Sequence, residues 1–185
     1  MELTTTLNKI QMRNPCSNGW RKLLKYLGKT VADDESLPFS VILDSNGLDD
    51  ALWCCHTAPE HNRVWRLYAV WCARQVQYLM TDQRSLNALD VAERHANGQA
   101  TDKELSAAWD DAKDAWDDAK DARVAWAAAG AAARVIAGNT AWVAKDAARE
   151  TAQAVVLVIA RTAKDAARET VQAAQAAKFR EMVSD

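Results

Sequence analysis

The chain has 185 residues, of which 49% are hydrophobic and 26% charged, and its formal net charge at pH 7 is −2. These totals are typical of a folded chain and exclude a largely disordered one. A net charge near zero also gives no overall attraction to nucleic acid or to anionic lipid, so neither is an expected partner. The longest apolar run, at 124–133, is shorter than the about 20 residues of a membrane-spanning helix. The N-terminus lacks the features of a signal peptide, so we expect a cytoplasmic protein.

The first hundred residues predict a series of short helices. "NGWRKLLKYLG" predicts a helix over 19–27 that Gly28 ends, and Pro38 favours the start of another, because proline suits a first helical turn. "GLDDALWCC" predicts a third helix that ends before Pro59, and "SLNALDVAERHAN" a last one. The strongest signal is "HNRVWRLYAVWCARQVQYLM", whose apolar residues recur every three to four positions. We expect no β-strand of any length.

The composition changes sharply near Gly98. All three prolines precede it, and alanine dominates after it. Gly98 suits the left-handed residue that ends a helix, and "TDKE" at Thr101 to Glu104 is a capping box that begins the next one. We therefore divide the chain into a compact helical region, 1–98, and a long-helix region rich in Ala and Trp, 101–185, which together form one folded unit.

A seven-residue unit, "WDDAKDA", occurs at Trp109 and again at Trp116. It places a heptad seam of small apolar residues on one side of a helix, and the two tryptophans beside that seam. Small side chains let two helix backbones approach closely, so we expect the seam to pack against a second helix, within the chain or in a second copy. The Asp and Lys residues off the seam form a solvated face. The seam consists of Leu105, Ala108, Ala112, Ala115, Ala119, Ala122 and Trp126.

A second repeat, "AKDAARET", occurs at Ala144 and at Ala163. It predicts another long amphipathic helix with Ala147 on its apolar side. "GNT" at Gly138 to Thr140 combines a helix end with a new cap. We therefore predict an all-α fold in which the N-terminal helices pack on an antiparallel hairpin of two helices, 102–137 and 140–183. The alternative is one continuous rod that bends at Gly138.

The chain carries no known catalytic signature and no known metal-binding signature. Cys54 and Cys55 are adjacent, and their spacing from His56 and His61 matches no common zinc module. Hydrolase, phosphate-binding and dinucleotide-binding sequence patterns are absent as well. We therefore expect buried or uninvolved thiols, no metal, no cofactor, no catalytic residues and a protein that is not an enzyme.

Charge is segregated in the N-terminal half. Basic residues occur without acids over 9–29, and acidic residues without bases over 33–60. One interpretation is that the two segments pack together. The other is that one of them contacts a partner. Asp49 and Asp50 would then face a basic protein, while Arg21, Lys22 and Lys25 would face a phosphate-bearing ligand. Asp49 and Asp50 also suit the first turn of a helix, where the dipole favours carboxylates.

Four stretches in this order carry a resemblance to a known family. The chain resembles the all-helical, Ala- and Trp-rich immunity proteins of bacteria and their phages, most specifically over residues 15–105. The resemblance implies a protein that neutralises a toxin, in the bacterial cytoplasm or in that of a phage's host. The stretches are "PCSNGWRKLLKYLGK" at 15–29, "ILDSNGLDDALWC" at 42–54, "WRLYAVWCARQVQYLM" at 65–80 and "RSLNALDVAERHANGQATDKEL" at 84–105.

Two functions follow from the sequence. The first is an immunity or counter-defence protein that neutralises a toxin or a host defence effector by stoichiometric binding, without catalysis. The second is a sponge that sequesters a nucleotide immune signal with the basic segment and with tryptophan faces. Either protein could also form a homo-oligomer through its alanine-rich helices.

Overall fold

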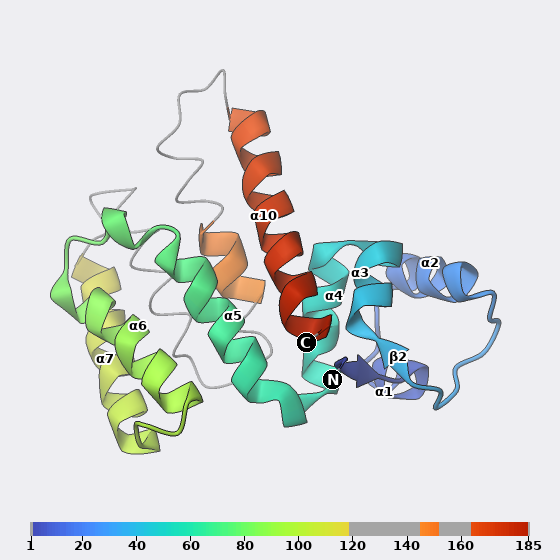
Figure 1. The fold of residues 1–185 in the computed structure, drawn as a ribbon, viewed down its shortest axis with the longest axis horizontal. Coiled ribbons are helices and arrows are strands. Elements are labelled where there is room, and N and C mark those ends of the chain that lie inside the picture. The colour runs from blue at the N-terminus through green and yellow to red at the C-terminus, as the bar shows by residue number, and fades with distance from the viewer. Residues whose placement is uncertain (1, 119–144, 152–163, 185) are drawn as a thin grey trace.

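The fold is all-α, as the sequence predicts, in a computed structural model that describes residues 2–118, 145–151 and 164–184. Helices and short strands follow one another along an elongated molecule, with α6 and α7 at one end, α1 and α2 at the other, and α5 and α10 between them (Figure 1). The helices are α1 (Leu7–Gln11), α2 (Ser17–Leu27), α3 (Phe39–Asn46), α4 (Leu48–Cys54), α5 (Asn62–Arg74), α6 (Gln83–Ala96), α7 (Asp102–Asp118) and α10 (Lys164–Ser184). Residues 145–151 are helical too, and 3₁₀ turns cover Cys55–Thr57, Pro59–His61 and Gln77–Leu79.

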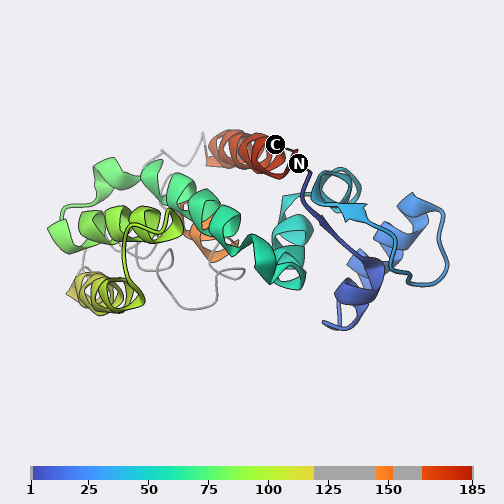
Figure 2. The ribbon, with the colours of Figure 1, turned by 60° about the horizontal axis from the view of Figure 1, so that its bottom comes forward.

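A two-stranded antiparallel ladder joins the N-terminus to the segment before α3. Strand β1 (Thr4–Thr5) pairs with β2 (Leu37–Pro38), and Thr4 lies opposite Pro38. The sequence did not predict these strands, because two residues are too few to show an alternating pattern. The backbone amide of Leu3 also donates to the carbonyl of Val183 at 2.7 Å, so the two ends of the described chain lie side by side (Figure 2).

Local signals fix several of the helix boundaries that the sequence predicts, but the helix expected over 61–80 ends earlier, at Arg74, and a 3₁₀ turn at Gln77–Leu79 follows it. The helix expected at 19–27 begins two residues earlier, because the Cys16 sulfur accepts a hydrogen bond from the Gly19 amide at 3.3 Å and caps α2. Gly28 ends it in the left-handed region, with φ 66°. The capping box is confirmed, since Thr101 Oγ1 accepts from the Glu104 amide at 3.2 Å and Glu104 accepts from the Thr101 amide at 2.8 Å. Gly98 is left-handed as well, with φ 71°.

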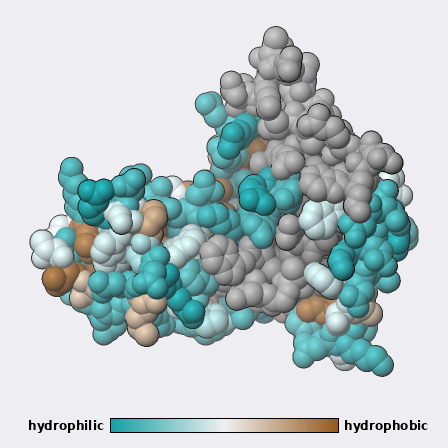
Figure 3. All heavy atoms as spheres, turned by 180° about the vertical axis from the view of Figure 1, so that it is seen from behind, coloured by the Kyte–Doolittle hydropathy of each residue, from teal (hydrophilic) through white to brown (hydrophobic). Residues whose placement is uncertain are grey.

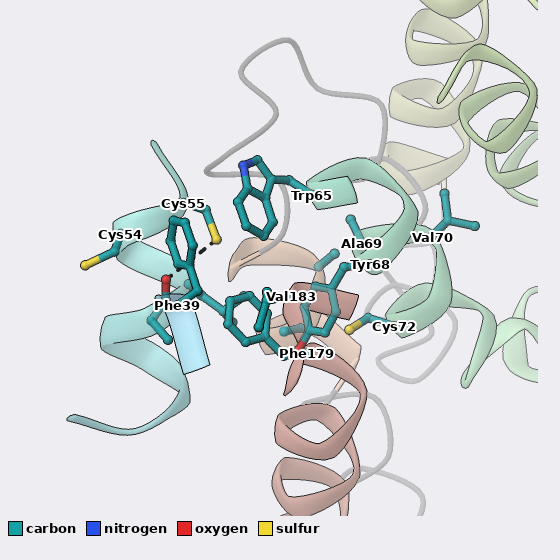
Figure 4. Packing of buried hydrophobic residues seen from close by; sticks show 14 of the residues in the cluster. Phe39, Cys54, Cys55, Trp65, Tyr68, Ala69, Val70, Cys72, Phe179 and Val183 are labelled. Atoms are coloured by element: carbon teal, nitrogen blue, oxygen red, sulfur yellow. Dashed lines mark hydrogen bonds between the residues drawn. The ribbon is translucent and has the colours of Figure 1, made fainter. Parts of the chain in front are cut away.

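An aromatic cluster forms the centre of the core. The ring of Phe179, from α10, lies 6.0 Å from that of Trp65 and 5.5 Å from that of Tyr68, both from α5. Phe39, at the start of α3, meets Trp65 edge to face at 4.9 Å (Figure 4). Trp65 and Tyr68 keep their polar atoms paired, with the carbonyls of Ala58 and Gln175. Helix α10 therefore closes a core that residues from three distant parts of the sequence supply.

The alanine seam packs against α6. Ala108, Ala112 and Ala115 are all buried, and α7 lies along α6 as an antiparallel neighbour (Figure 1). Trp109 and Trp116 flank the seam and are partly buried against the core, as the repeat predicts. The helix that receives the seam is thus the one directly before it in the sequence. One cluster of buried residues includes members from both sides of Gly98.

The described parts of the two expected long helices have different neighbours. Helix α7 covers the beginning of the expected 102–137 helix, whereas residues 145–151 and α10 belong to 140–183. Helix α10 packs against α3, α4 and α5, and Ala147 is buried as the second repeat predicts. The break at Gly138, which would fold the two helices into a hairpin, lies outside the described residues. So do the seam residues Ala119, Ala122 and Trp126.

Candidate functional site

A cavity of about 190 Å³ lies at the α1–α2 end of the molecule, between α2, α3, α4 and the helical residues 145–151. Its walls are largely apolar, with two half-buried tryptophans among them. One carboxylate and one ammonium group also line it. The polar and aromatic residues that matter for its chemistry are Cys16, Trp20, Asn46, Asp50, Trp53 and Lys145.

Gly19 lets α2 lie close to the side chain of Asp50, from α4, beside this cavity. A Cβ atom at this position would lie 2.7 Å from Oδ2 of Asp50, closer than real Cβ contacts, and 3.1 Å from the Cys16 sulfur, which is tighter than most of them. A glycine inside a helix usually weakens it, so a close approach of this kind is a reason for its presence. Gly19 was the sequence signal that could have indicated the cavity.

Asn46 fixes the orientation of Asp50. Its Nδ2 donates to Oδ2 of Asp50 at 2.7 Å and to the carbonyl of Gly19 at 2.9 Å, and its Oδ1 accepts from Ser45 Oγ at 2.8 Å. The amide therefore has a partner for each of its polar atoms and is held in one place. Within the described residues, Oδ1 of Asp50 accepts no hydrogen bond. The cavity thus contains a positioned carboxylate with acceptor capacity to spare.

The adjacent cysteines point in different directions. Cys55 points into the core, where its sulfur donates to the carbonyl of Ala51, while Cys54 points away from the aromatic cluster and lines the cavity (Figure 4). Burial, and secondarily the carboxylate of Asp50, raises the pKa of the Cys54 thiol well above its usual range. Burial also raises the pKa of Cys55, and it raises that of Cys72 to about 12. These three thiols are therefore poor nucleophiles at neutral pH, because the thiolate is the reactive form.

The two predicted carboxylates have different surroundings. Asp49 and Asp50 both lie in the first turn of α4, as the helix-dipole explanation predicts. The side chain of Asp49 is exposed, whereas Asp50 is half-buried and turned toward Asn46. The structure therefore separates the expected acidic pair, since one member faces solvent and the other lines a cavity.

The three predicted cations share the outer side of α2, opposite the cavity. Arg21, Lys22 and Lys25 are all exposed, and Tyr26 beside them has 58% of its surface exposed. We call these four residues the cationic face. Arg21 donates to the Ser17 carbonyl and to Asn18 Oδ1, which holds its guanidinium along the helix.

Other charges of the N-terminal half pair with one another. Lys29 bonds to Asp33 at 2.5 Å and to Glu35 at 2.6 Å, and Lys9 bonds to Glu60 at 3.3 Å. The interpretation that the basic and acidic segments pack together is thus correct for these residues. It does not cover the cationic face, because in the described part of the chain no ion pair joins Arg21, Lys22 or Lys25 to an acid.

Large hydrophobic side chains are exposed near the cationic face in the sequence. Met12 is 80% exposed and Val31 72%, and Tyr26 lies between them. The surface over the α1–α2 end accordingly mixes hydrophobic and hydrophilic residues (Figure 3). Aromatic residues, Met and Arg are enriched at the centres of protein interfaces.

The comparisons with known proteins add no family. No protein-family model, no curated protein and no solved structure matches the chain. Among the described residues, no group of three or more His, Cys, Asp or Glu side chains is placed to hold a metal ion. In the same residues, no helix has the length and apolar character to cross a membrane.

Proposed function

We propose that the protein binds another protein stoichiometrically through the cationic face of α2, and that it neutralises a toxin or a host defence effector in this way. The observation that carries the proposal is the set of three exposed cations beside the exposed ring of Tyr26. Cations without an ion partner on a rigid helix attract a complementary acidic surface and speed its association. The partner surface is therefore acidic.

The shape of the cationic face favours a protein over a nucleotide. Small ligands are usually bound in concave sites that bury most of their surface. The three cations instead project from the outer side of a helix, and the nearby cavity, at about 190 Å³, is smaller than the about 300–1,000 Å³ of pockets for drug-sized ligands. These features give the nucleotide sponge less support than the protein inhibitor.

The class of partner comes from the resemblance to immunity proteins. That resemblance is most specific over residues 15–105, which include the whole of α2 and the cavity beside it. An immunity protein acts on a toxin that its own cell encodes or meets, and a phage protein of the same type acts on a host effector. An inhibitor of this kind needs a rigid complementary surface and no chemical step.

Charge reversal on α2 tests the proposal. The partner to use is the product of the gene next to this one, because immunity genes commonly lie beside their toxins. We expect Lys22→Glu with Lys25→Glu to weaken binding at low salt by roughly tenfold, or about 1.4 kcal/mol. The loss should shrink as salt screens the charges. Calorimetry gives the affinity and the stoichiometry.

The matched control is Lys103→Glu with Lys113→Glu, which makes the same charge change on exposed residues of α7. Asp49→Lys tests the alternative acidic epitope. Equal affinity of the α2 variant and the control would contradict the proposal, as would a loss confined to Asp49→Lys. Protection at far below one copy per target would indicate turnover and an enzyme instead.

A further inference from the structure

We infer that the cavity between α2, α3 and α4 binds a small zwitterion, a molecule of amino-acid size with an ammonium group, an anionic group and an apolar body. The site is separate from the cationic face, because it lies on the opposite side of α2. The inference therefore does not depend on the proposed function.

The volume of the cavity sets the size of the ligand. The cavity volume of about 190 Å³ is many times larger than the volume of about 10–15 Å³ that one ordered water needs. It is smaller than the about 300–1,000 Å³ of pockets for drug-sized ligands. A single-ring or branched aliphatic molecule suits this space, and a mononucleotide does not.

Asp50 supplies the anchor for the ammonium group. Its Oδ2 is held by the Asn46 amide at 2.7 Å, and Oδ1 has no donor within the described residues. A carboxylate that a fully bonded amide holds in place loses little freedom when a cation binds, so the charge-assisted hydrogen bond is strong. Gly19 leaves room for this orientation, because a Cβ atom there would lie 2.7 Å from Oδ2.

Trp20 and Trp53 supply apolar and aromatic walls. Both rings are half-buried and line the same cavity as Asp50. The ring of His56 lies edge to face against Trp53, with centroids 4.3 Å apart, which restricts the orientation of that indole. Tryptophan faces accept both apolar groups and cations, and a cation near a ring gains more where water is excluded.

Lys145 supplies the opposite charge. It lines the cavity from the helical residues 145–151, and within the described chain it forms no ion pair with Asp50 or with any other acid. Two unlike charges line one largely apolar cavity, and within the described residues neither has an ion partner, so the cavity fits a ligand that carries both charges. Lys145 would repel a purely cationic ligand, and Asp50 would repel a purely anionic one, so each would bind more weakly than the zwitterion.

The experiment uses the purified protein and three probes with one body, L-phenylalanine, phenethylamine and 3-phenylpropionate, within a panel of the natural L-amino acids. Calorimetry and tryptophan fluorescence measure binding up to about 10 mM. We expect at least one amino acid to bind and its decarboxylated or deaminated counterpart to bind at least about tenfold more weakly.

Two conservative variants locate the site. Asp50→Asn keeps an acceptor for Asn46 and Lys145→Met keeps most of the side-chain length, and we expect each to weaken binding of the amino acid by about tenfold or more. Lys103→Met, on the exposed side of α7, is the matched control and should bind like the unchanged protein. Occupancy should also slow alkylation of Cys16 by iodoacetamide, because Cys16 is an exposed thiol that lines the cavity.

Three results would overturn the inference. The first is that no member of the panel binds. The second is that the single-charge analogues bind as tightly as the zwitterion. The third is that Asp50→Asn and Lys145→Met bind the amino acid like Lys103→Met does. None of these results bears on the binding of a protein to the cationic face, because the test uses the protein alone.

Discussion

Two helix junctions in this protein are built on opposite principles. Where α3, α5 and α10 meet, large aromatic rings fill the space, and Phe179, Trp65 and Tyr68 are buried almost completely. Where α6 meets α7, three alanines occupy the contact and the backbones approach each other. The first junction depends on the volume of each side chain, so it is sensitive to truncation. The second depends on small side chains at the contact, so it is sensitive to their enlargement.

Polar side-chain pairs reinforce the second junction at both of its ends. Arg84, near the start of α6, bonds to Asp118 at 2.7 Å, and His95, near its end, bonds to Asp102 at 2.8 Å. Exposed pairs of this kind contribute little by themselves, so they set the alignment of α6 and α7 more than the stability. The aromatic junction has one such pair as well, Arg180 with Asp44, but its large buried residues carry most of its free energy.

Truncation at the aromatic junction should have the largest effect. Phe179→Ala removes a ring that contacts three other aromatic residues, so we expect the free energy of unfolding to fall by about 3–5 kcal/mol. Chemical denaturation measures the change. Tyr78→Ala, which removes a ring that is 69% exposed, is the control and should change the value little. Similar losses in the two variants would show that the aromatic cluster does not contribute more to the free energy of unfolding than an exposed ring does.

Enlargement at the alanine seam should have the next largest effect. Ala115→Leu puts three additional carbon atoms into a position that is 1% exposed, and we expect a loss of about 1–3 kcal/mol from overpacking. Ala107→Leu makes the same change on an exposed position of the same helix and should leave the melting temperature almost unchanged. If the two variants had the same melting temperature, the seam would not pack closely against α6.

Loss of the cap at the start of α7 should cost less. Thr101→Ala leaves the Glu104 amide without its acceptor, and we expect a loss of about 1 kcal/mol. Thr101→Ser keeps the oxygen and should restore most of the stability. Thermal melts of the three proteins give the comparison. Equal melting temperatures of the Ala and Ser variants would mean that the hydrogen bond does not stabilise the turn between α6 and α7.

The smallest effect concerns pH at the aromatic junction. The hydrogen bond from Arg180 lowers the pKa of Asp44, and this pair joins α10 to α3. A carboxyl with a lowered pKa stabilises the folded state above its unfolded pKa of about 3.9, and the contribution disappears as the pH falls through the folded pKa. Asp44→Asn should therefore be less stable than the unchanged protein at neutral pH and should approach it in acid, as the pH falls through the lowered folded pKa of Asp44.

Urea denaturation at the two pH values measures this difference, which should also shrink in high salt because the pair is exposed. Asp110→Asn, at an exposed position of α7, is the control that removes one carboxylate elsewhere on the surface. A constant difference between Asp44→Asn and the unchanged protein at both pH values would exclude a charge effect.

Much of the helical order was predictable because its signals are local. Gly28 and Gly98 end helices in the left-handed region, and Thr101 with Glu104 begins α7, in each case through atoms only a few residues apart. The burial of Ala108, Ala112 and Ala115 was predictable too, because it repeats along one helix face with the heptad. The short strands β1 and β2 were not predictable, since a pair of residues gives no periodicity.

The candidate site shows the same division. Exposure of Arg21, Lys22 and Lys25 follows from the amphipathic pattern of one helix, so the sequence alone could place them together. It could not separate Asp49 from Asp50, because the difference arises from Asn46 and from the close approach of α2 at Gly19. It also could not bring Lys145 to the same cavity as Asp50, almost a hundred residues earlier.

The sequence by itself therefore determined the fold class, helix ends such as those at Gly28 and Gly98, and which face of several helices is apolar, because these depend on neighbours within one or two turns. Only the tertiary structure decided that the alanine seam meets α6, that α10 closes the aromatic core, and that a carboxylate, an ammonium group and two indoles share one cavity. The physical reason is that the hydrophobic pattern of a sequence shows each helix's apolar face but not which other apolar face it packs against. Which pair of faces packs together depends on the shapes and volumes of side chains that are far apart in the chain.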